Sequence, residues 1–394
     1  MGTEVTPRRW TRVKFCDVVR DVKESERDPK SAGITRYVGL EHLEPECLRL
    51  ASFGDLTSES VSFTKLFRKG QVLFGKRRAY QRKVAVADFG GICSSDILTF
   101  EPKNGDLISE LLPFIVQSDA FFDYAIDTSS GSLSPRTRWS QLKDFEFQLP
   151  PETEQRRIAD LLIAAEDDFY CRREIVERLG QLMLSTLTHF FPRKPLGTPK
   201  TPNEVELQSL CAEPITYGIV QAGPNVEDGV PYIRVSDMVG KTLTLEGMLR
   251  TAPEIAERFK RSEVRAEEIV FALRGEPGLV RIVPAPLDGA NLTQGTARIA
   301  VRQDVSRDYV LWAIRSPRVT QQVTIEAKGS TFKEITLKSI RALKIPTFEV
   351  EKHNYIAQIL NELSDGLEKA ELALASSDSL RKELRESILM GGRA

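Results

Sequence analysis

Apolar residues between positions 152 and 191 recur in steps of three and four, and charged residues fill the positions between them. Because one helical turn takes about 3.6 residues, this spacing predicts one long α-helix with a single apolar stripe. The stripe is too narrow for a helix that is buried on all sides, so we expect it to pair with a second helix. Its members are Ile158, Leu162, Ala165, Phe169, Val176, Leu179, Met183 and Phe190.

A second apolar stripe nearer the C-terminus supplies this partner. It shows the same three-four spacing, and after a break Leu380, Leu384 and Ile388 resume it. We therefore expect a second long helix that packs along the first. The apolar positions before the break are Ile356, Leu360, Leu363, Leu367, Ala370 and Leu374.

The two stripes belong to a sequence repeat with a period of about 195 to 198 residues. The run LKDFEFQLPPETEQRRIADLL at 142–162 resembles LKSIRALKIPTFEVEKHNYIAQIL at 337–360. Further upstream, RYVGLEHL at 36–43 resembles PYIRVSDM at 231–238. Each copy is therefore a body of roughly 150 residues followed by a long helix.

Each body contains short runs with strand composition and one longer amphipathic stretch. In the first body we expect strands at QVLF and KVAVA and one helix over 107–125. In the second we expect strands at EIVFALRG and TARIAV and one helix over 308–323. Strands and helices do not alternate regularly, which favours an α+β fold.

Proline-rich sequence separates the two copies, because four prolines fall within the twelve residues 192–203. Such a segment is typical of a stiff, exposed linker. We accordingly predict two bodies at 1–149 and 204–345, two long helices at 150–191 and 346–394, and a linker at 192–203.

Bulk composition gives no general attraction to nucleic acid. The formal net charge is -1, so any such binding must depend on local clusters of cations. The five cysteines are scattered without metal-ligand spacing, which suits a reducing cytoplasm. No apolar run approaches the length needed to cross a membrane, and we expect no membrane association.

Motifs that would indicate catalysis are weak or missing. Gly240-Lys241-Thr242 lacks the glycine of a phosphate-binding loop, because Val235 stands five positions before Gly240. Glu326-Ala327-Lys328 resembles the end of a nuclease motif, but short patterns of this kind arise by chance. The sequence lacks the Asn-Pro-Pro-aromatic segment of adenine methyltransferases. We therefore expect no catalytic residues and no metal site.

One run of cations in the first body is suited to nucleic acid. No acidic residue occurs between Lys65 and Lys83. Clustered cations neutralise phosphates, arginine can contact guanine edges, and glutamine can contact adenine. A solvated charged loop is the alternative interpretation. The candidate DNA-binding residues are Lys76, Arg77, Arg78, Tyr80, Gln81, Arg82 and Lys83.

Two glycine-serine loops close the bodies, with Gly131-Ser132 in the first and Gly329-Ser330 in the second. Their amides and hydroxyls could bind phosphates, although plain turns fit the pattern equally well. The second body offers fewer cations, including Arg281 and Arg298. The remaining candidate residues are Ser132, Arg136 and Arg138 in the first body, and Arg274, Lys328, Ser330, Thr331 and Lys333 in the second.

Over nearly its full length the chain resembles the DNA-specificity subunits of type I restriction–modification enzymes. The resemblance lies in YVGLEHLE at 37–44, in KGQVLFGKRRAYQRKVAVADFGGICSSDIL at 69–98, in GSLSPRTRWSQLKDFEFQLPPETEQRRIADLL, and in ITYGIVQAG with VPYIRVSDM. The second copy departs from the pattern, because its basic hairpin is reduced and Lys352-His353 stands where Gln155-Arg156 opens the first helix.

This resemblance implies two similar α/β target-recognition domains in tandem, each followed by a long helix, with the two helices paired as an antiparallel coiled coil. It implies that each domain reads one half of a split, asymmetric site in double-stranded DNA. Two methyltransferase subunits and restriction (translocase/endonuclease) subunits would assemble on the chain. S-adenosylmethionine, ATP and Mg²⁺ would then be bound by those partners and not by this chain.

Two other functions stay open from the sequence. A coiled-coil scaffold without DNA reading is consistent with the near-neutral net charge. An enzyme in its own right is disfavoured by the missing motifs. A methyl-transfer assay on the isolated chain tests the enzyme, and a gel shift of the chain with its partner methyltransferase at low and moderate salt tests the scaffold.

Overall fold

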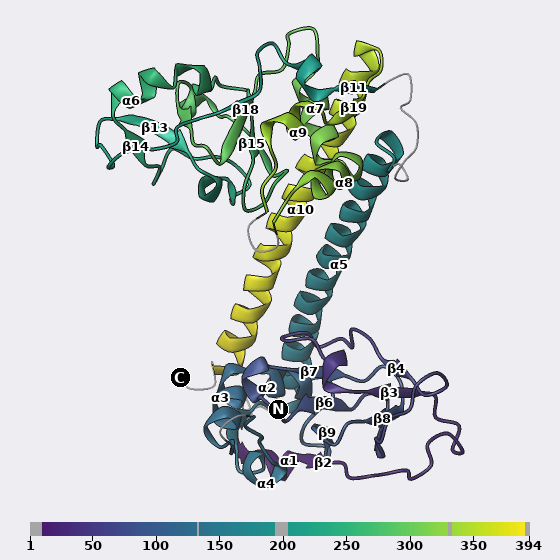
Figure 1. Cartoon of the computed structure of the whole chain (residues 1–394). Helices are drawn as coiled ribbons and strands as arrows, with labels where there is room; N and C mark the ends of the chain where they lie inside the picture. Colours follow the sequence, from purple (N-terminus) through teal and green to yellow (C-terminus); the bar gives the residue numbers. More distant parts are fainter. Residues whose placement is uncertain (1–9, 132–133, 194–203, 330–332, 391–394) are drawn as a thin grey trace, which may run out of the picture. The chain divides into compact units, whose positions relative to one another are not determined.

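The computed structural model describes residues 10–131, 134–193, 204–329 and 333–390 (Figure 1). The chain forms two compact units, and each unit combines one body with parts of both long helices. Unit 1 consists of residues up to Arg173 together with those from Leu372 onward. Unit 2 runs from Glu174 to Glu371.

The body of unit 1 contains a four-stranded antiparallel sheet in the order β2-β9-β6-β7 and a mixed sheet in the order β4-β3-β8-β5. A separate pair, β1 with β10, brings the start of the body next to its end. Its strands are β1 (Thr11–Lys14), β2 (Val19–Asp21), β3 (Arg36–Val38), β4 (Gly54–Asp55), β5 (Lys65–Phe67), β6 (Val72–Gly75), β7 (Val84–Val86), β8 (Gly91–Cys93), β9 (Ile97–Pro102) and β10 (Glu146–Leu149). Its helices are α1 (Phe15–Val18), η1 (Leu40–His42), η2 (Ala79–Gln81), α2 (Leu112–Gln117), α3 (Asp119–Asp127) and α4 (Trp139–Leu142).

The body of unit 2 repeats this plan with the sheets β12-β18-β15-β16 and β14-β13-β17 and the pair β11 with β19. Its strands are β11 (Glu204–Glu206), β12 (Thr216–Tyr217), β13 (Val230–Ile233), β14 (Arg250–Thr251), β15 (Ile269–Ala272), β16 (Val280–Ile282), β17 (Asn291–Leu292), β18 (Thr296–Ile299) and β19 (Lys344–Pro346). Its helices are η3 (Leu207–Leu210), η4 (Val235–Met238), α6 (Pro253–Arg258), η5 (Lys260–Ser262), η6 (Ala285–Leu287), α7 (Arg307–Arg315), α8 (Pro317–Glu326) and α9 (Leu337–Arg341).

The predicted α+β class and the duplication are confirmed by these matching elements. In both bodies a parallel strand pair, β3 with β8 or β13 with β17, lies within an otherwise antiparallel arrangement. The expectation of one amphipathic helix per body is wrong. A buried serine with extended backbone, Ser118 in one body and Ser316 in the other, separates two helices and caps the second of them. Serine is a strong N-cap residue, so each serine favours a new helix start.

The two long helices are α5 (Glu152–Phe190) and α10 (Val350–Met390), and the predicted antiparallel pairing is confirmed (Figure 1). In unit 1 the first turns of α5, at Ile158 and Leu162, share a hydrophobic core with Leu384 of α10. In unit 2 the first turns of α10, at Ile356, share a core with the end of α5 at Leu187. The start of each helix therefore packs where the other ends.

The apolar stripes are buried to different extents along the helices. Ile158, Leu162, Ile356 and Leu360 are fully buried in the cores of the bodies. The other predicted helix-pairing residues are half-buried, as expected for a seam between two helices with solvent on both sides. These residues are Phe169, Val176, Leu179, Met183, Leu363, Leu367 and Leu374.

The prediction that Leu380 continues the stripe is wrong, because 54% of Leu380 is exposed. The buried positions at this end of α10 are Ser377, Arg381 and Arg385. Their burial depends on acidic partners, and an apolar pattern cannot detect such positions.

The repeat also needs a corrected register where the long helices begin. Gln155 and His353 are each the fourth residue of their helix, and both are buried. Gln155 accepts a hydrogen bond from the backbone N–H of Ile108 at 2.9 Å, and His353 Nε2 accepts one from Phe348 at 3.1 Å. His353 therefore occupies the place of Gln155 itself. Neither long helix, nor any other helix in the described part of the chain, is long and apolar enough to cross a bilayer.

Candidate nucleic-acid interface

The basic run of the first body forms the hairpin that joins β6 to β7. These strands pair antiparallel, and η2 lies at the turn between them. Arg78 and Arg82 flank η2 in left-handed conformations, with φ of 57° and 52°. Left-handed backbone at a residue other than glycine costs about 1 kcal/mol or more and is concentrated at functional sites. The turn is thus held in a defined shape by its surroundings.

The glycine-serine loop is joined directly to this hairpin. Arg77 and Arg136 form a β-bridge, and the Arg78 N–H donates to the Pro135 carbonyl at 2.8 Å. The Thr137 N–H donates to the Lys76 carbonyl at 3.0 Å. Two segments about 60 residues apart in sequence therefore form one surface. The predicted residue Ser132 lies outside the described residues.

Several of the predicted side chains on this surface face solvent. Arg78, Arg136 and Arg138 are exposed, and Tyr80 is 54% exposed. Gln81 is half-buried. Three guanidinium groups and an aromatic ring beside an amide match the donors and stacking surfaces that DNA-binding proteins use.

No acidic residue lies within the basic run itself, but acidic residues from elsewhere in the chain pair with part of it. Asp96 lies 3.2 Å from Arg136 Nε and 3.9 Å from Arg77 Nη1. Arg82 pairs with Glu46 at 3.2 Å and with Asp119 at 2.6 Å. Arg78 and Arg138 are exposed and have no ion-pair partner among the residues that the structure describes, so their charges are available to an external anion.

Arg82 and Lys83 serve the body itself. The Arg82 guanidinium lies 4.8 Å from the centre of the Phe122 ring and donates to the Gln117 carbonyl at 3.0 Å. Lys83 Nζ donates to the Leu40 carbonyl at 2.7 Å. Because these side chains are half-buried and already bound, they shape the hairpin more than they extend the exposed surface.

The corresponding hairpin of the second body, between β15 and β16, is close to electrically neutral. Arg274 Nε lies 3.0 Å from Glu334, and the backbones of these residues form a β-bridge. Glu334 occupies the position that Arg136 has in the first body, so the sign of the charge is reversed. Lys328 and Lys333 are exposed on the same loop, whereas Ser330 and Thr331 lie outside the described residues.

The two further arginines of the second body are not free surface cations. Arg298 is buried between Glu268 and Glu213, at 2.7 Å from each, and its hydrogen bonds with Glu268 raise its pKa most. Arg281 Nε donates to the Gly240 carbonyl at 2.7 Å. The cations that remain for an external anion are therefore fewer in the second body than in the first.

The acidic residues that organise the first hairpin were not predicted from the sequence. Glu46, Asp96 and Asp119 come from separate loops and helix starts, and Glu386 comes from α10. Local sequence carries no signal for pairs separated by up to 267 positions. Only the folded arrangement brings these groups together.

No cluster of metal-ligating side chains occurs in the described ranges. Burial raises the pKa of the Cys93 thiol to about 12, which leaves it protonated and unreactive near neutral pH. Burial likewise raises the pKa of Cys211 to about 12. These thiols fill space in the bodies.

Comparison with known protein families gives two matches along the chain. A family described as the type I restriction modification DNA specificity domain matches residues 25–170 and 219–375. The two matched segments coincide with the two copies of the repeat and include the first part of each long helix.

Individual relatives are more distant. The specificity subunit of the type I restriction enzyme EcoBI from Escherichia coli is 26% identical over 298 residues, covering 68% of this chain and 62% of that subunit. The EcoDI specificity subunit from Escherichia coli is 25% identical over 190 residues, covering 47% and 42%. The chain thus spans less than two thirds of the length of each.

Among solved structures, the S subunit of a type I restriction–modification system from M. genitalium has the same fold. The match has a TM-score of 0.60 and covers 99% of this chain and 98% of that one. The two sequences are 14% identical, so the likeness concerns the fold alone.

Proposed function

The chain belongs to the family of type I restriction modification DNA specificity proteins, and on this premise we propose that it reads a split, asymmetric site in double-stranded DNA. One body would read each half of the site. The observation that carries the proposal is the joined surface of the first body, where the β6–β7 hairpin meets the glycine-serine loop. Its exposed Arg78, Arg136 and Arg138 form a local cationic surface on a chain of nearly neutral net charge.

In the first body, arginines would provide most of the binding free energy through phosphates, while side chains at the turn would read bases. Phosphate contacts set position and register, and base-edge contacts give specificity. Gln81 presents an amide that can pair bidentately with adenine, and Arg78 can pair with guanine. Tyr80 presents a ring for apolar contact with a thymine methyl group or a sugar.

The second body would depend less on phosphate neutralisation. Arg274 is paired with Glu334, which leaves Lys328 and Lys333 as the exposed cations of this loop. Because the two surfaces differ in charge and in residue type, we expect the two half-sites to differ in sequence. The recognised site would therefore be asymmetric.

We further propose that two methyltransferase subunits and restriction subunits assemble on this chain, and that those partners bind S-adenosylmethionine, ATP and Mg²⁺. Support comes from large apolar side chains that both long helices expose. Leu161, Leu182 and Leu184 on α5 are 42%, 49% and 57% exposed, and Tyr355 and Leu372 on α10 are 59% and 66% exposed. A contiguous apolar patch marks a protein-binding surface, and we propose that these side chains contribute to such patches along the helices.

The test is selection of DNA by the full chain in complex with its methyltransferase subunits. The complex is incubated with a duplex library whose central region is randomised, at low and at moderate salt, and the bound DNA is sequenced. We expect two short conserved blocks of different sequence separated by a fixed gap. A complex that assembles but enriches no sequence would support the alternative of a scaffold without DNA reading.

A further inference from the structure

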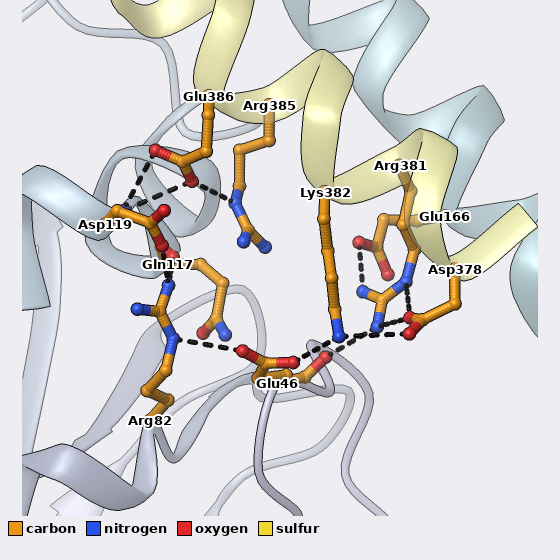
Figure 2. Close-up of polar contacts among 10 residues, drawn as sticks. All are labelled: Glu46, Arg82, Gln117, Asp119, Glu166, Asp378, Arg381, Lys382, Arg385 and Glu386. Carbon is orange, nitrogen blue, oxygen red and sulfur yellow. Dashed lines mark hydrogen bonds and ion pairs between the residues drawn. The ribbon is translucent and has the colours of Figure 1, made fainter. Parts of the chain in front are cut away.

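The end of α10 is linked to the β6–β7 hairpin of unit 1 by two series of polar contacts, each of which passes through an intermediate residue (Figure 2). Lys382 and Glu386 project from adjacent turns of α10 towards the body. In Figure 2 Arg82, at the end of the hairpin, lies between Glu46 and Asp119, which are the partners that these two α10 residues contact.

The first series of contacts runs through Glu46. Lys382 Nζ lies 2.5 Å from Glu46 Oε2, and Arg82 Nε lies 3.2 Å from Glu46 Oε1. The backbone also takes part, since the Glu46 N–H donates to the Arg82 carbonyl at 3.0 Å. Glu46 itself adopts a left-handed conformation with φ of 54°. One carboxylate therefore connects a helix residue to a hairpin residue 300 positions earlier in the sequence.

The second series runs through the start of α3. Both carboxylate oxygens of Glu386 accept a hydrogen bond from the Asp119 N–H, at 3.1 and 3.2 Å. Asp119 Oδ1 in turn accepts a hydrogen bond from Arg82 Nη2 at 2.6 Å. A carboxylate at the start of a helix is favoured by the partial positive charge of the free N–H groups there. Glu386 thus holds the first residue of α3, Asp119, whose side chain binds Arg82.

Both series converge on Arg82, and Arg82 ends the turn that presents Arg78, Tyr80 and Gln81. Its φ of 52° is unfavourable for arginine and persists only while its side chain and carbonyl are held. Ion pairs with charged hydrogen bonds are directional, so they specify geometry more sharply than apolar packing does. The polar contacts of α10 therefore act on the two acidic residues that hold Arg82, in addition to the Gln117 carbonyl and the Phe122 ring that Arg82 contacts within the body.

Attachment of α10 to the body has a separate origin. Leu384, Ile388 and Leu389 pack against the hydrophobic core of the body. Apolar burial provides adhesion without much directional preference. Removal of Lys382 should consequently leave α10 attached while it loosens Glu46, whose carbonyl still accepts a hydrogen bond from Arg381 Nη2 at 3.1 Å. Removal of Glu386 loosens Asp119 and also takes from the buried Arg385 the carboxylate that lies 2.9 Å from its Nε, so assembly of this variant is checked separately.

We propose that Lys382 and Glu386 are positioning residues for DNA reading by the first body, although neither touches DNA. The inference rests on the proposed function, because it requires the hairpin to read bases. The end of the second long helix would then control recognition of the half-site that belongs to the first body, and recognition of the other half-site would be unaffected.

The test repeats the selection from a randomised duplex library with variants of the full chain in complex with methyltransferase subunits. Lys382→Met removes the charge and keeps the side-chain stem, and Glu386→Ala removes the carboxylate. For each variant we expect enrichment at the first body's block to fall by about 2- to 30-fold, the usual range for indirect coupling, with the second block unchanged. Lys382→Arg, which can keep the ion pair with Glu46, should restore the first block.

Glu383→Ala is the matched control, because Glu383 is exposed on the same turn of α10 and has no ion-pair partner among the described residues. Equal enrichment of the first block in Lys382→Met, Glu386→Ala and the control would overturn the inference, as would equal reduction at both blocks. If the unaltered complex enriches no split sequence, the proposed function itself fails, and this result is distinguishable from the others. If the Glu386→Ala variant does not assemble with the methyltransferase subunits, comparison of Lys382→Met with Lys382→Arg still tests whether α10 positions the hairpin.

Discussion

His353 stacks face to face on Tyr309, with ring centroids 3.9 Å apart and an angle of 15° between the ring planes. Both rings are buried in the core of unit 2, and His353 Nε2 accepts a hydrogen bond from the Phe348 N–H. Burial lowers the pKa of His353 below its ordinary value of 6.5. The neutral ring is therefore the form that the folded unit holds.

This arrangement predicts that unit 2 loses stability in mildly acidic solution. Below pH 6.5 the unfolded chain binds a proton at His353 that the folded chain does not bind. The free energy of unfolding contributed by this residue is complete above pH 6.5 and is lost as the pH falls through the lower folded pKa. Urea denaturation at about pH 8 and about pH 5 measures the decrease. His353→Gln, whose amide oxygen can accept from Phe348, should flatten the profile, whereas His189→Gln on the exposed face of α5 should not.

Arg78 and Arg138 should bind DNA phosphates. Each Arg→Ala substitution at these positions should weaken binding to every DNA sequence and reduce the slope of log affinity against log salt by about 0.9 for each phosphate that is no longer neutralised. Fluorescence anisotropy across a salt series measures the slope. Arg27→Ala, at an exposed arginine outside the hairpin, serves as control and should leave the slope unchanged. A slope that is unchanged for Arg78→Ala and Arg138→Ala would mean that these residues do not bind phosphate.

The buried ion pair between Arg381 and Glu166, with atoms 2.8 Å apart, should be strongly sensitive to single substitutions. Burial lowers the pKa of Arg381, but Glu166 and Asp378 outweigh this effect and leave it raised. Arg381→Met leaves Glu166 buried without its cation and should cost about 3 to 5 kcal/mol of unfolding free energy. Adding Glu166→Leu should recover most of this stability, because a buried pair and an apolar pair are often similar in stability. Chemical denaturation of both variants is the measurement, and a double variant as unstable as the single one would contradict the explanation.

The length of the long helices should set the gap between the half-sites. We expect that four residues inserted into both helices, after Arg173 in α5 and after Glu371 in α10, add about 6 Å of helix and lengthen the gap by one or two base pairs. Four residues are close to one turn, so the apolar stripes stay nearly in phase. Sequencing of methylated sites in cells that express the variant shows the gap. An unchanged gap with intact half-sites would mean that the helices do not act as a spacer.

Strong periodic patterns were predictable from the sequence, and interactions between distant charged groups were not. The spacing of apolar residues that begins at Ile158 and at Ile356 predicted both helices, because an apolar stripe places an apolar residue at every third or fourth position. Arg381 interrupts that trace, yet it is almost completely buried, with its guanidinium 3.9 Å from the centre of the Phe169 ring. A charged residue is read as exposed unless its partner is known, and Glu166 lies 215 positions away.

The candidate site shows the same division. Arg78 and Tyr80 were predicted from local composition, and the structure places both on the surface. That they contact DNA stays a prediction. Arg82 belongs to the same basic run, but its side chain is half-buried because it forms ion pairs with Glu46 and Asp119, which come from separate segments. The joining of the hairpin to the glycine-serine loop is likewise a tertiary interaction without a local signal.

The core shared by Leu162 and Leu384 has a consequence for synthesis of the protein on the ribosome. The first body emerges early, but the part of α10 that covers its core is translated about 200 residues later. At a translation rate of about 5 to 20 residues per second, the apolar surface of the first body stays uncovered for roughly 10 to 40 seconds, until the end of α10 has been synthesised. During this interval the nascent chain is exposed to premature association with other chains. We therefore expect a chain that stops at Glu371 to require chaperones or to aggregate, a result that sedimentation after expression would reveal.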